Sequence, residues 1–147
     1  MLYKIIILML TSIALHAADD DDARTSRIKE LETLQFEYEA KIANVNYKLL
    51  KGSNLLASYK SIALKYWEEG EEKFTKFVQK VSRKFAMGKD FESVIEKTSL
   101  GKYGKAINTM VLRITLQDIY LDKIIAQFNQ LIEELTIINK ELQLLKS

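Results

Sequence analysis

The residue types that carry most enzyme chemistry are nearly absent from this chain of 147 residues. Its one histidine is His16, and it has no cysteine. These two residue types supply most zinc ligands, the thiol nucleophiles and the base of the serine triad. Because His16 lies in a segment that we expect to be removed, the mature chain would contain neither type. We therefore predict a non-enzyme with no catalytic residue, no metal site and no cofactor.

Three short segments still carry residues that can do chemistry in other proteins. The run EEGEE (68–72) offers four carboxylates, but acid–base pairs need unlike, partly buried surroundings, and this run reads as solvated helix surface. GKYGK (101–105) precedes a helix start, where backbone N–H groups can hold an anion, but it lacks the Walker A spacing and predicts a loop. DDDD (19–22) lacks the glycine and terminal glutamate of a calcium loop, and predicts a disordered acidic leader over 18–24.

The N-terminus has the pattern of a targeting segment. Lys4 precedes eleven uncharged residues (5–15), and alanines follow at 17 and 18. An apolar run of this length falls short of the roughly 20 residues that span a bilayer. We predict a signal peptide over 1–17, cleaved after Ala17 rather than Ala18, and export to a periplasm or the extracellular space. An uncleaved N-terminal anchor is the alternative.

Charge and composition bound the remaining chain. The 22 basic and 20 acidic residues give a net charge of +2, without the clustered basic excess that nucleic-acid binding needs. We therefore expect no nucleic-acid partner. The sequence has no proline and only five glycines, which permits long helices. Without cysteine, stability must come from packing.

Apolar residues recur at steps of three and four in three segments, the spacing of one helix face; the steps alternate in the first and third segments, whereas those of the second drift towards an eleven-residue repeat. The first track runs from Ile28 to Leu49, the second from Leu56 to Phe85, and the third from Ile107 to Leu145. They predict an all-α, elongated antiparallel three-helix bundle with coiled-coil-like packing, in a single domain over 25–147. We expect helices at about 25–51, 54–87, 91–98 and 104–146.

Glycines and polar residues set the expected boundaries of these helices. Gly52 should end the first helix, Ser53 or Asn54 should cap the second, and Gly88 should end it. Gly70 should weaken or kink the second helix. Asp90 can cap the short helix over 91–98.

Two glutamines lie inside the apolar tracks. In an up-down-up bundle the first and third helices run parallel, and Gln35 and Gln117 could then form one buried polar layer that fixes the register. Around Gln117, residues 110–121 are apolar on several faces, which predicts a helix segment buried on all sides.

Two surfaces are candidates for contact with other molecules. We expect the third helix to be longer than the first, so the stripe near its end would be left for the first helix, a second copy or a partner protein to cover. This candidate partner or self-association stripe consists of Leu131, Leu135, Ile138, Leu142 and Leu145. The other surface is the basic amphipathic segment 73–85, whose candidate contacts with an anionic surface are Lys73, Lys76, Lys80, Arg83 and Lys84. A helix with its phenylalanines in the core explains the same pattern.

These features favour a non-enzymatic exported interaction protein, such as an envelope or secreted scaffold, adaptor or chaperone. A membrane-active helical protein that works through 73–85 is the alternative.

The first testable prediction concerns processing. N-terminal sequencing of the purified exported protein should begin at Ala18. Recovery of Met1 on protein in the inner-membrane fraction would contradict cleavage and favour the anchor.

Overall fold

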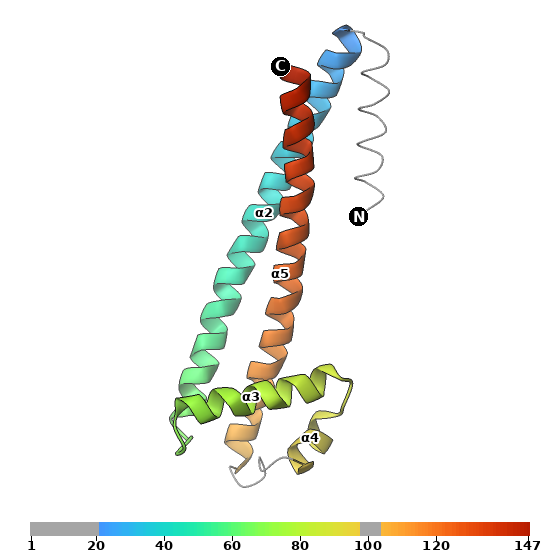
Figure 1. The fold of residues 1–147 in the computed structure, drawn as a ribbon. Helices are drawn as coiled ribbons and strands as arrows, with labels where there is room; N and C mark the ends of the chain where they lie inside the picture. Colours follow the sequence, from blue (N-terminus) through green and yellow to red (C-terminus); the bar gives the residue numbers. More distant parts are fainter. Residues whose placement is uncertain (1–20, 98–103) are drawn as a thin grey trace. The chain divides into compact units, whose positions relative to one another are not determined.

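The computed structural model describes residues 21–97 and 104–147, and it is helical in four segments. These are α2 (Asp21–Leu64), α3 (Glu71–Ala86), α4 (Phe91–Lys97) and α5 (Gly104–Lys146), shown in Figure 1. The all-α class predicted from the heptads is confirmed, and the described residues contain no strand. The predicted signal peptide lies outside the described residues. No helix in the described part is long and apolar enough to cross a membrane.

The chain divides into two compact units, which share the two long helices. The terminal unit comprises the described residues up to Tyr47 together with Ala126–Ser147. The central unit comprises Lys48–Ile125. Whether the chain acts as a single domain stays a prediction.

In the terminal unit, α2 and α5 lie side by side in opposite directions (Figure 1). Arg24 near the start of α2 donates from Nε to the carbonyl oxygen of Leu145 at 2.7 Å. Further along α2, Nε2 of Gln35 donates to Oδ1 of Asn139 at 2.8 Å. Residue numbers rise along one helix as they fall along the other, so the pair is antiparallel. The expected track positions Leu31, Tyr38 and Val45 are buried, as predicted.

In the central unit, the same two helices are again antiparallel. Gln117 of α5 donates from Nε2 to the carbonyl oxygen of Gly52 at 3.0 Å, and the Arg113 guanidinium lies 5.9 Å from the ring centroid of Tyr59. A core cluster joins these helices to α3 and α4. Its buried members are Ala63, Trp67, Phe74, Val78, Val81, Val94, Ile107, Val111 and Ile114.

The predicted helix boundary at Gly52 is wrong, because α2 continues through this glycine for 44 residues in all. A Cβ built on Gly52 would lie 2.8 Å from Cδ2 of Leu121 and 3.0 Å from Nε2 of Gln117. The glycine therefore allows a close approach of α5, and its helix-propensity cost of about 1 kcal/mol is offset by packing. Ser53 and Asn54 are accordingly inside a helix and cap nothing.

The long helix predicted over 54–87 is also wrong. The break falls between Leu64 and Glu71, where Gly70 adopts φ of +91° and precedes the first residue of α3. Trp67 stabilises this turn: its Nε1 donates to the Gly70 carbonyl at 3.0 Å, and its ring lies 5.3 Å from that of Phe74. Two long helices therefore replace the expected three.

The other boundaries are close to those predicted. Helix α3 ends at Ala86, and Gly88 follows with φ of +82°, as expected of a glycine stop. Helix α4 begins directly after Asp90 and α5 begins at Gly104. At the N-terminal end, the prediction of a disordered leader is wrong for residues 21–24, because these residues form the first turn of α2. Asp21 and Asp22 there are stabilised by the positive end of the helix dipole.

The second prediction tests the close approach at Gly52. Gly52→Leu should lower the free energy of unfolding by about 1–3 kcal/mol, because the added atoms overpack the contact with Leu121. Ser53→Leu, at the exposed neighbouring position, is the matched control and should change it by less than about 0.5 kcal/mol. Equal effects of the two substitutions in chemical denaturation would contradict the close approach.

Candidate interaction surface

The stripe proposed from the sequence as a partner surface is largely buried in the terminal unit. Leu131, Ile138, Leu142 and Leu145 are buried and Leu135 is half-buried. The expectation that this stripe lacks cover rested on a first helix of about 25 residues. That premise is wrong, because α2 begins at Asp21 and, with 44 residues, matches the 43 of α5.

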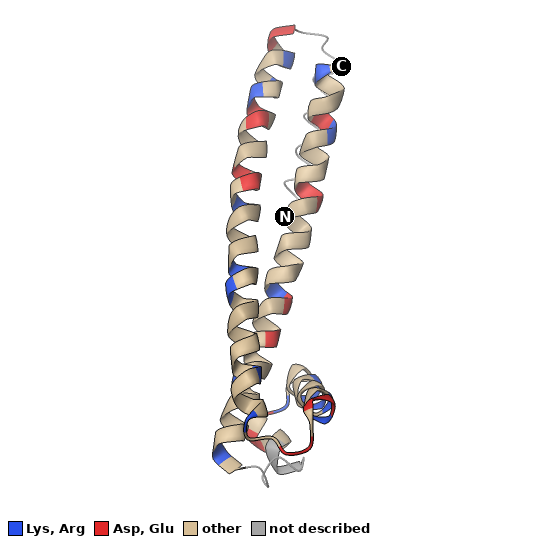
Figure 2. Ribbon diagram, turned by 90° about the vertical axis from the view of Figure 1, so that its left-hand side faces the viewer, with Lys and Arg blue, Asp and Glu red and all other residues tan. Residues whose placement is uncertain are grey.

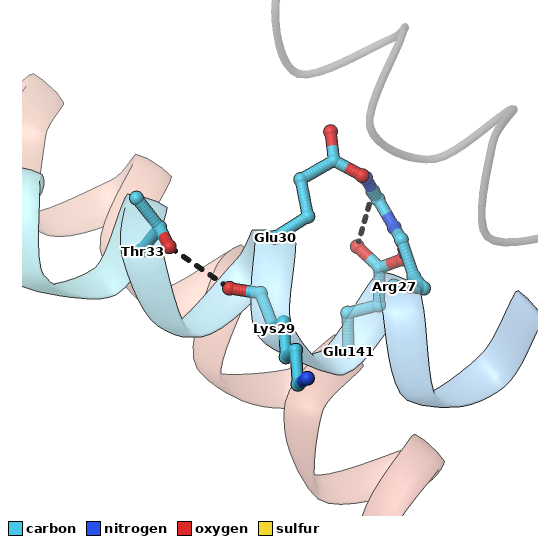
Figure 3. A network of polar contacts seen from close by, with 5 residues as sticks. All are labelled: Arg27, Lys29, Glu30, Thr33 and Glu141. Carbon is cyan, nitrogen blue, oxygen red and sulfur yellow. Dashed lines mark hydrogen bonds and ion pairs between the residues drawn. The ribbon is translucent and has the colours of Figure 1, made fainter. Parts of the chain in front are cut away.

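A polar network fixes the register of α2 against α5 in this unit (Figure 3). The Arg27 guanidinium donates to both carboxylate oxygens of Glu141, from Nε at 3.0 Å and from Nη2 at 3.2 Å. Its Nη1 also lies 2.9 Å from Oε2 of Glu30. Burial opposes the charge of Arg27, but these two carboxylates outweigh it and raise the pKa of the guanidinium above its usual value. A buried pair of this kind specifies alignment more than it adds stability.

A second buried contact joins Tyr38 of α2 to Glu134 of α5. Both side chains are buried, and the tyrosine hydroxyl donates to the carboxylate. Burial, followed by this hydrogen bond and the charge of Glu134, raises the pKa of Tyr38 to about 12. Oε1 of Glu134 has no hydrogen-bond partner in the described part of the chain.

The expected polar layer of Gln35 and Gln117 does not form. Each glutamine instead meets its own partner, Asn139 for Gln35 and the Gly52 carbonyl for Gln117. The cause is the antiparallel course of α2 and α5, which the predicted up-down-up order made parallel.

The candidate basic surface lies on α3 in the central unit. Lys73, Lys76, Lys80 and Arg83 are exposed and Lys84 is half-buried. On the opposite side of this helix, Phe74, Val78 and Val81 are buried in the core. The cations are therefore accessible, whereas the apolar side is already occupied.

The other charged segments singled out in the sequence, EEGEE and GKYGK, show no binding site among their described residues. The four glutamates of EEGEE are exposed, as predicted, and Glu72 forms a surface ion pair with Lys76 at 3.2 Å. Of GKYGK, only Gly104 and Lys105 belong to the described residues. No group of three or more potential metal ligands occurs in the part of the chain that the structure describes.

An apolar face on the central unit was not predicted. The expectation that residues 110–121 are buried on all sides holds for Val111 and Thr115, but fails at Leu116 and Tyr120. On α2, steps of four and three place Leu55, Tyr59 and Ile62 on one side of the helix. The four most open side chains of this set are between 38% and 48% exposed: Leu55, Ile62, Leu116 and Tyr120.

Two contacts show that these side chains share one side of the helix pair. Arg113, which is three residues before Leu116, lies over the ring of Tyr59. The Tyr120 ring lies 3.7 Å from the position of a Cβ on Gly52. We call the set of Leu55, Tyr59, Ile62, Leu116 and Tyr120 the apolar face of the central unit. The signal for its α2 half was present in the sequence, but the expected helix break at Gly52 hid it.

The charges beside this face are all positive. Lys48 lies seven residues before Leu55, and Lys123 lies seven residues after Leu116, so both lie on the same sides of their helices as the apolar face. Lys48 and Lys123 lie towards one end of the face and Arg113 lies towards the other, over Tyr59, and all three cations are exposed. Asp118 and Asp122 lie on the other side of α5, where burial raises the pKa of Asp118 above its usual value although Lys60 opposes the shift. The apolar face is therefore complementary to a negatively charged, partly apolar partner.

Comparison with protein-family models, with curated proteins and with solved structures finds no match to this chain.

The third prediction follows from the buried tyrosine. The folded protein holds the Tyr38 proton up to about pH 12, whereas the unfolded chain releases it near its ordinary pKa of 10. This contribution to stability is present in full below pH 10 and is lost as the pH rises through about 12. Unfolding measured from pH 9 to 12 should show this fall in the wild type and a smaller one in Tyr38→Phe.

At neutral pH, Tyr38→Phe should also cost about 1–3 kcal/mol, because Glu134 loses its hydrogen bond. Tyr47→Phe, at an exposed position of the same helix, keeps Tyr38 and should retain the wild-type profile. Identical pH profiles for the wild type and Tyr38→Phe would contradict the assignment.

Proposed function

We propose that this chain is a non-enzymatic, exported interaction protein that binds a partner through the apolar face of the central unit. The observation that carries the proposal is the exposure of Leu116 and Tyr120 beside Leu55 and Ile62, on two helices that also carry buried tracks. A contiguous set of partly exposed apolar residues is a common mark of an interaction site.

The chemistry of the surface indicates the kind of partner. A third amphipathic helix can pack its apolar side against the apolar face that the two antiparallel helices present. The cations Lys48, Arg113 and Lys123 flank the apolar face and would pair with acidic side chains on the partner helix. We therefore propose an amphipathic helix with acidic flanks as the ligand, in a scaffold, adaptor or chaperone role.

Export to a periplasm or the extracellular space forms part of this proposal. It is supported by the charge and apolar pattern of residues 1–18.

Peripheral binding to an anionic membrane through α3 is the second candidate. It is favoured by the exposure of Lys73, Lys76, Lys80 and Arg83 on one helix. Phe74 and Val81, however, contribute to the core, so the helix would contact lipid through its cations alone unless the unit opens. Co-sedimentation with anionic vesicles that is lost in Lys76→Glu/Lys80→Glu would support this candidate.

The fourth prediction tests the apolar face directly. Tagged wild type should retain a specific protein from the native envelope or secreted fraction, and Leu116→Ser/Tyr120→Ser should lose it, because the substitutions remove apolar contact area. Met87→Ser is the matched control, since Met87 is the more exposed at 76% and is not part of the face. Circular dichroism should show unchanged helicity for both variants.

Two results would contradict the proposal. One is retention of the same protein by all three baits, which would place the binding site elsewhere. The other is loss of the protein in Lys76→Glu/Lys80→Glu alone, which would assign binding to α3.

A further inference from the structure

Helix α2 carries a second apolar stripe on the side away from its buried track. Phe36, Ala40, Ala43, Tyr47 and Leu50 follow one another at steps of four, three, four and three, and all five are exposed. Phe36 is 74% exposed, Tyr47 62% and Leu50 64%. We call these five residues the outer stripe of α2. This spacing is that of the contact positions of a coiled coil.

The outer stripe is distinct from the core track of the same helix. The buried residue Val45 lies two positions before Tyr47, and Tyr38 lies two positions after Phe36, which places each pair about 200° apart around the helix. Single exposed apolar residues are ordinary on a protein surface. Here five exposed apolar residues, three of them large and two of them alanine, follow the heptad spacing. Such a pattern is typical of a surface that packs against another helix.

The charges of α2 indicate which helix that is. All acidic residues of α2 precede Ala40, and every charged residue after Ala40 is a lysine (Figure 2). The acidic set is Asp21, Asp22, Glu30, Glu32, Glu37 and Glu39, and the later lysines are Lys41, Lys48, Lys51 and Lys60. The outer stripe therefore runs from an acidic half of the helix to a basic half.

Two charged residues beside the outer stripe indicate how a second copy of α2 would align with the first. Glu37 follows Phe36 and Lys51 follows Leu50, so both occupy the same flanking position of the heptad, and both are exposed. Their midpoint is Asn44. If two copies of α2 pair antiparallel about that point, Glu37 of each copy meets Lys51 of the other, twice. A parallel pairing would place like charges together.

The same alignment also suits the apolar side chains. About Asn44, Tyr47 of one copy lies within one residue of the level of Ala40 of the other, and Leu50 lies within two residues of the level of Phe36. The surface is thus complementary to itself, as a twofold interface requires.

We propose that the chain forms an antiparallel homodimer through the outer stripe of α2. The occupant of this stripe is a second copy of the chain. The outer stripe shares no residue with the apolar face of the central unit.

The fifth prediction uses single charge reversals. Sedimentation of the purified chain should show a dimer, and Lys51→Glu and Glu37→Lys should each weaken it about tenfold or more, because two attractive contacts become two repulsive ones. An equimolar mixture of the two variants should restore the dimer, since every flanking contact is then attractive. Lys80→Glu on α3 is the matched control and should leave the dimer intact.

Phe36→Ser/Tyr47→Ser should abolish the dimer without loss of helicity, because these side chains are exposed within one copy. A monomeric wild type at about 100 µM would overturn the proposal. So would a dimer that persists at wild-type strength in both charge variants, which a parallel pairing or another interface would give. Binding of anionic vesicles by the outer stripe in place of dimer formation would overturn it as well.

Discussion

The antiparallel pairing of α2 with α5 is the constraint on which the rest of the structure depends. In the terminal unit the pairing rests on the track from Leu31 to Val45 and on the buried end of α5. In the central unit it rests on the contact of Gly52 with Leu121 and on the core cluster around Ile114. Apolar burial supplies the driving force in each unit, at roughly 1.5–3 kcal/mol for each large side chain. The shorter helices α3 and α4 then add to the central unit alone.

Buried polar contacts select the alignment that apolar packing leaves open. A heptad stripe tolerates shifts by one repeat, because each repeat offers the same kind of surface. The bidentate pair of Arg27 with Glu141, and the bond between Tyr38 and Glu134, can each form in one register only. A shift would separate the buried carboxylates of Glu134 and Glu141 from Tyr38 and Arg27, at a cost of several kcal/mol. The polar contacts in the terminal unit therefore specify the register of α2 against α5.

The sequence predicted the helical class and most of the core, but not the course of the chain. The third track from Ile107 to Leu145 was right in that eight of its twelve positions are buried and the other four half-buried, because burial follows the heptad wherever two helices pack. Gly52 misled the prediction, since a glycine that ends a helix and one that admits a neighbouring helix look alike in sequence. Only the position of Leu121 distinguishes them.

The candidate surfaces were harder to predict for the same reason. If a helix ends at Gly52, Leu55 and Ile62 belong to the next helix. The sequence then gives no reason to expect them exposed next to Tyr120. The supposed free end of α5 followed from the same error, because a short first helix leaves Leu142 uncovered. The outer stripe from Phe36 to Leu50 is visible in the sequence only when α2 is read as one helix.

Cysteine cross-linking tests the central claim most directly, because the chain has no cysteine of its own. Gln35 and Asn139 are in hydrogen-bond contact across the terminal unit. The double variant Gln35→Cys/Asn139→Cys should form an intramolecular disulfide rapidly under mild oxidation, seen as a mobility shift on non-reducing gels. The pair Gln35→Cys/Gln117→Cys, which a parallel α2 and α5 would bring together, should remain reduced. A disulfide in the second variant, with none in the first, would contradict the antiparallel account.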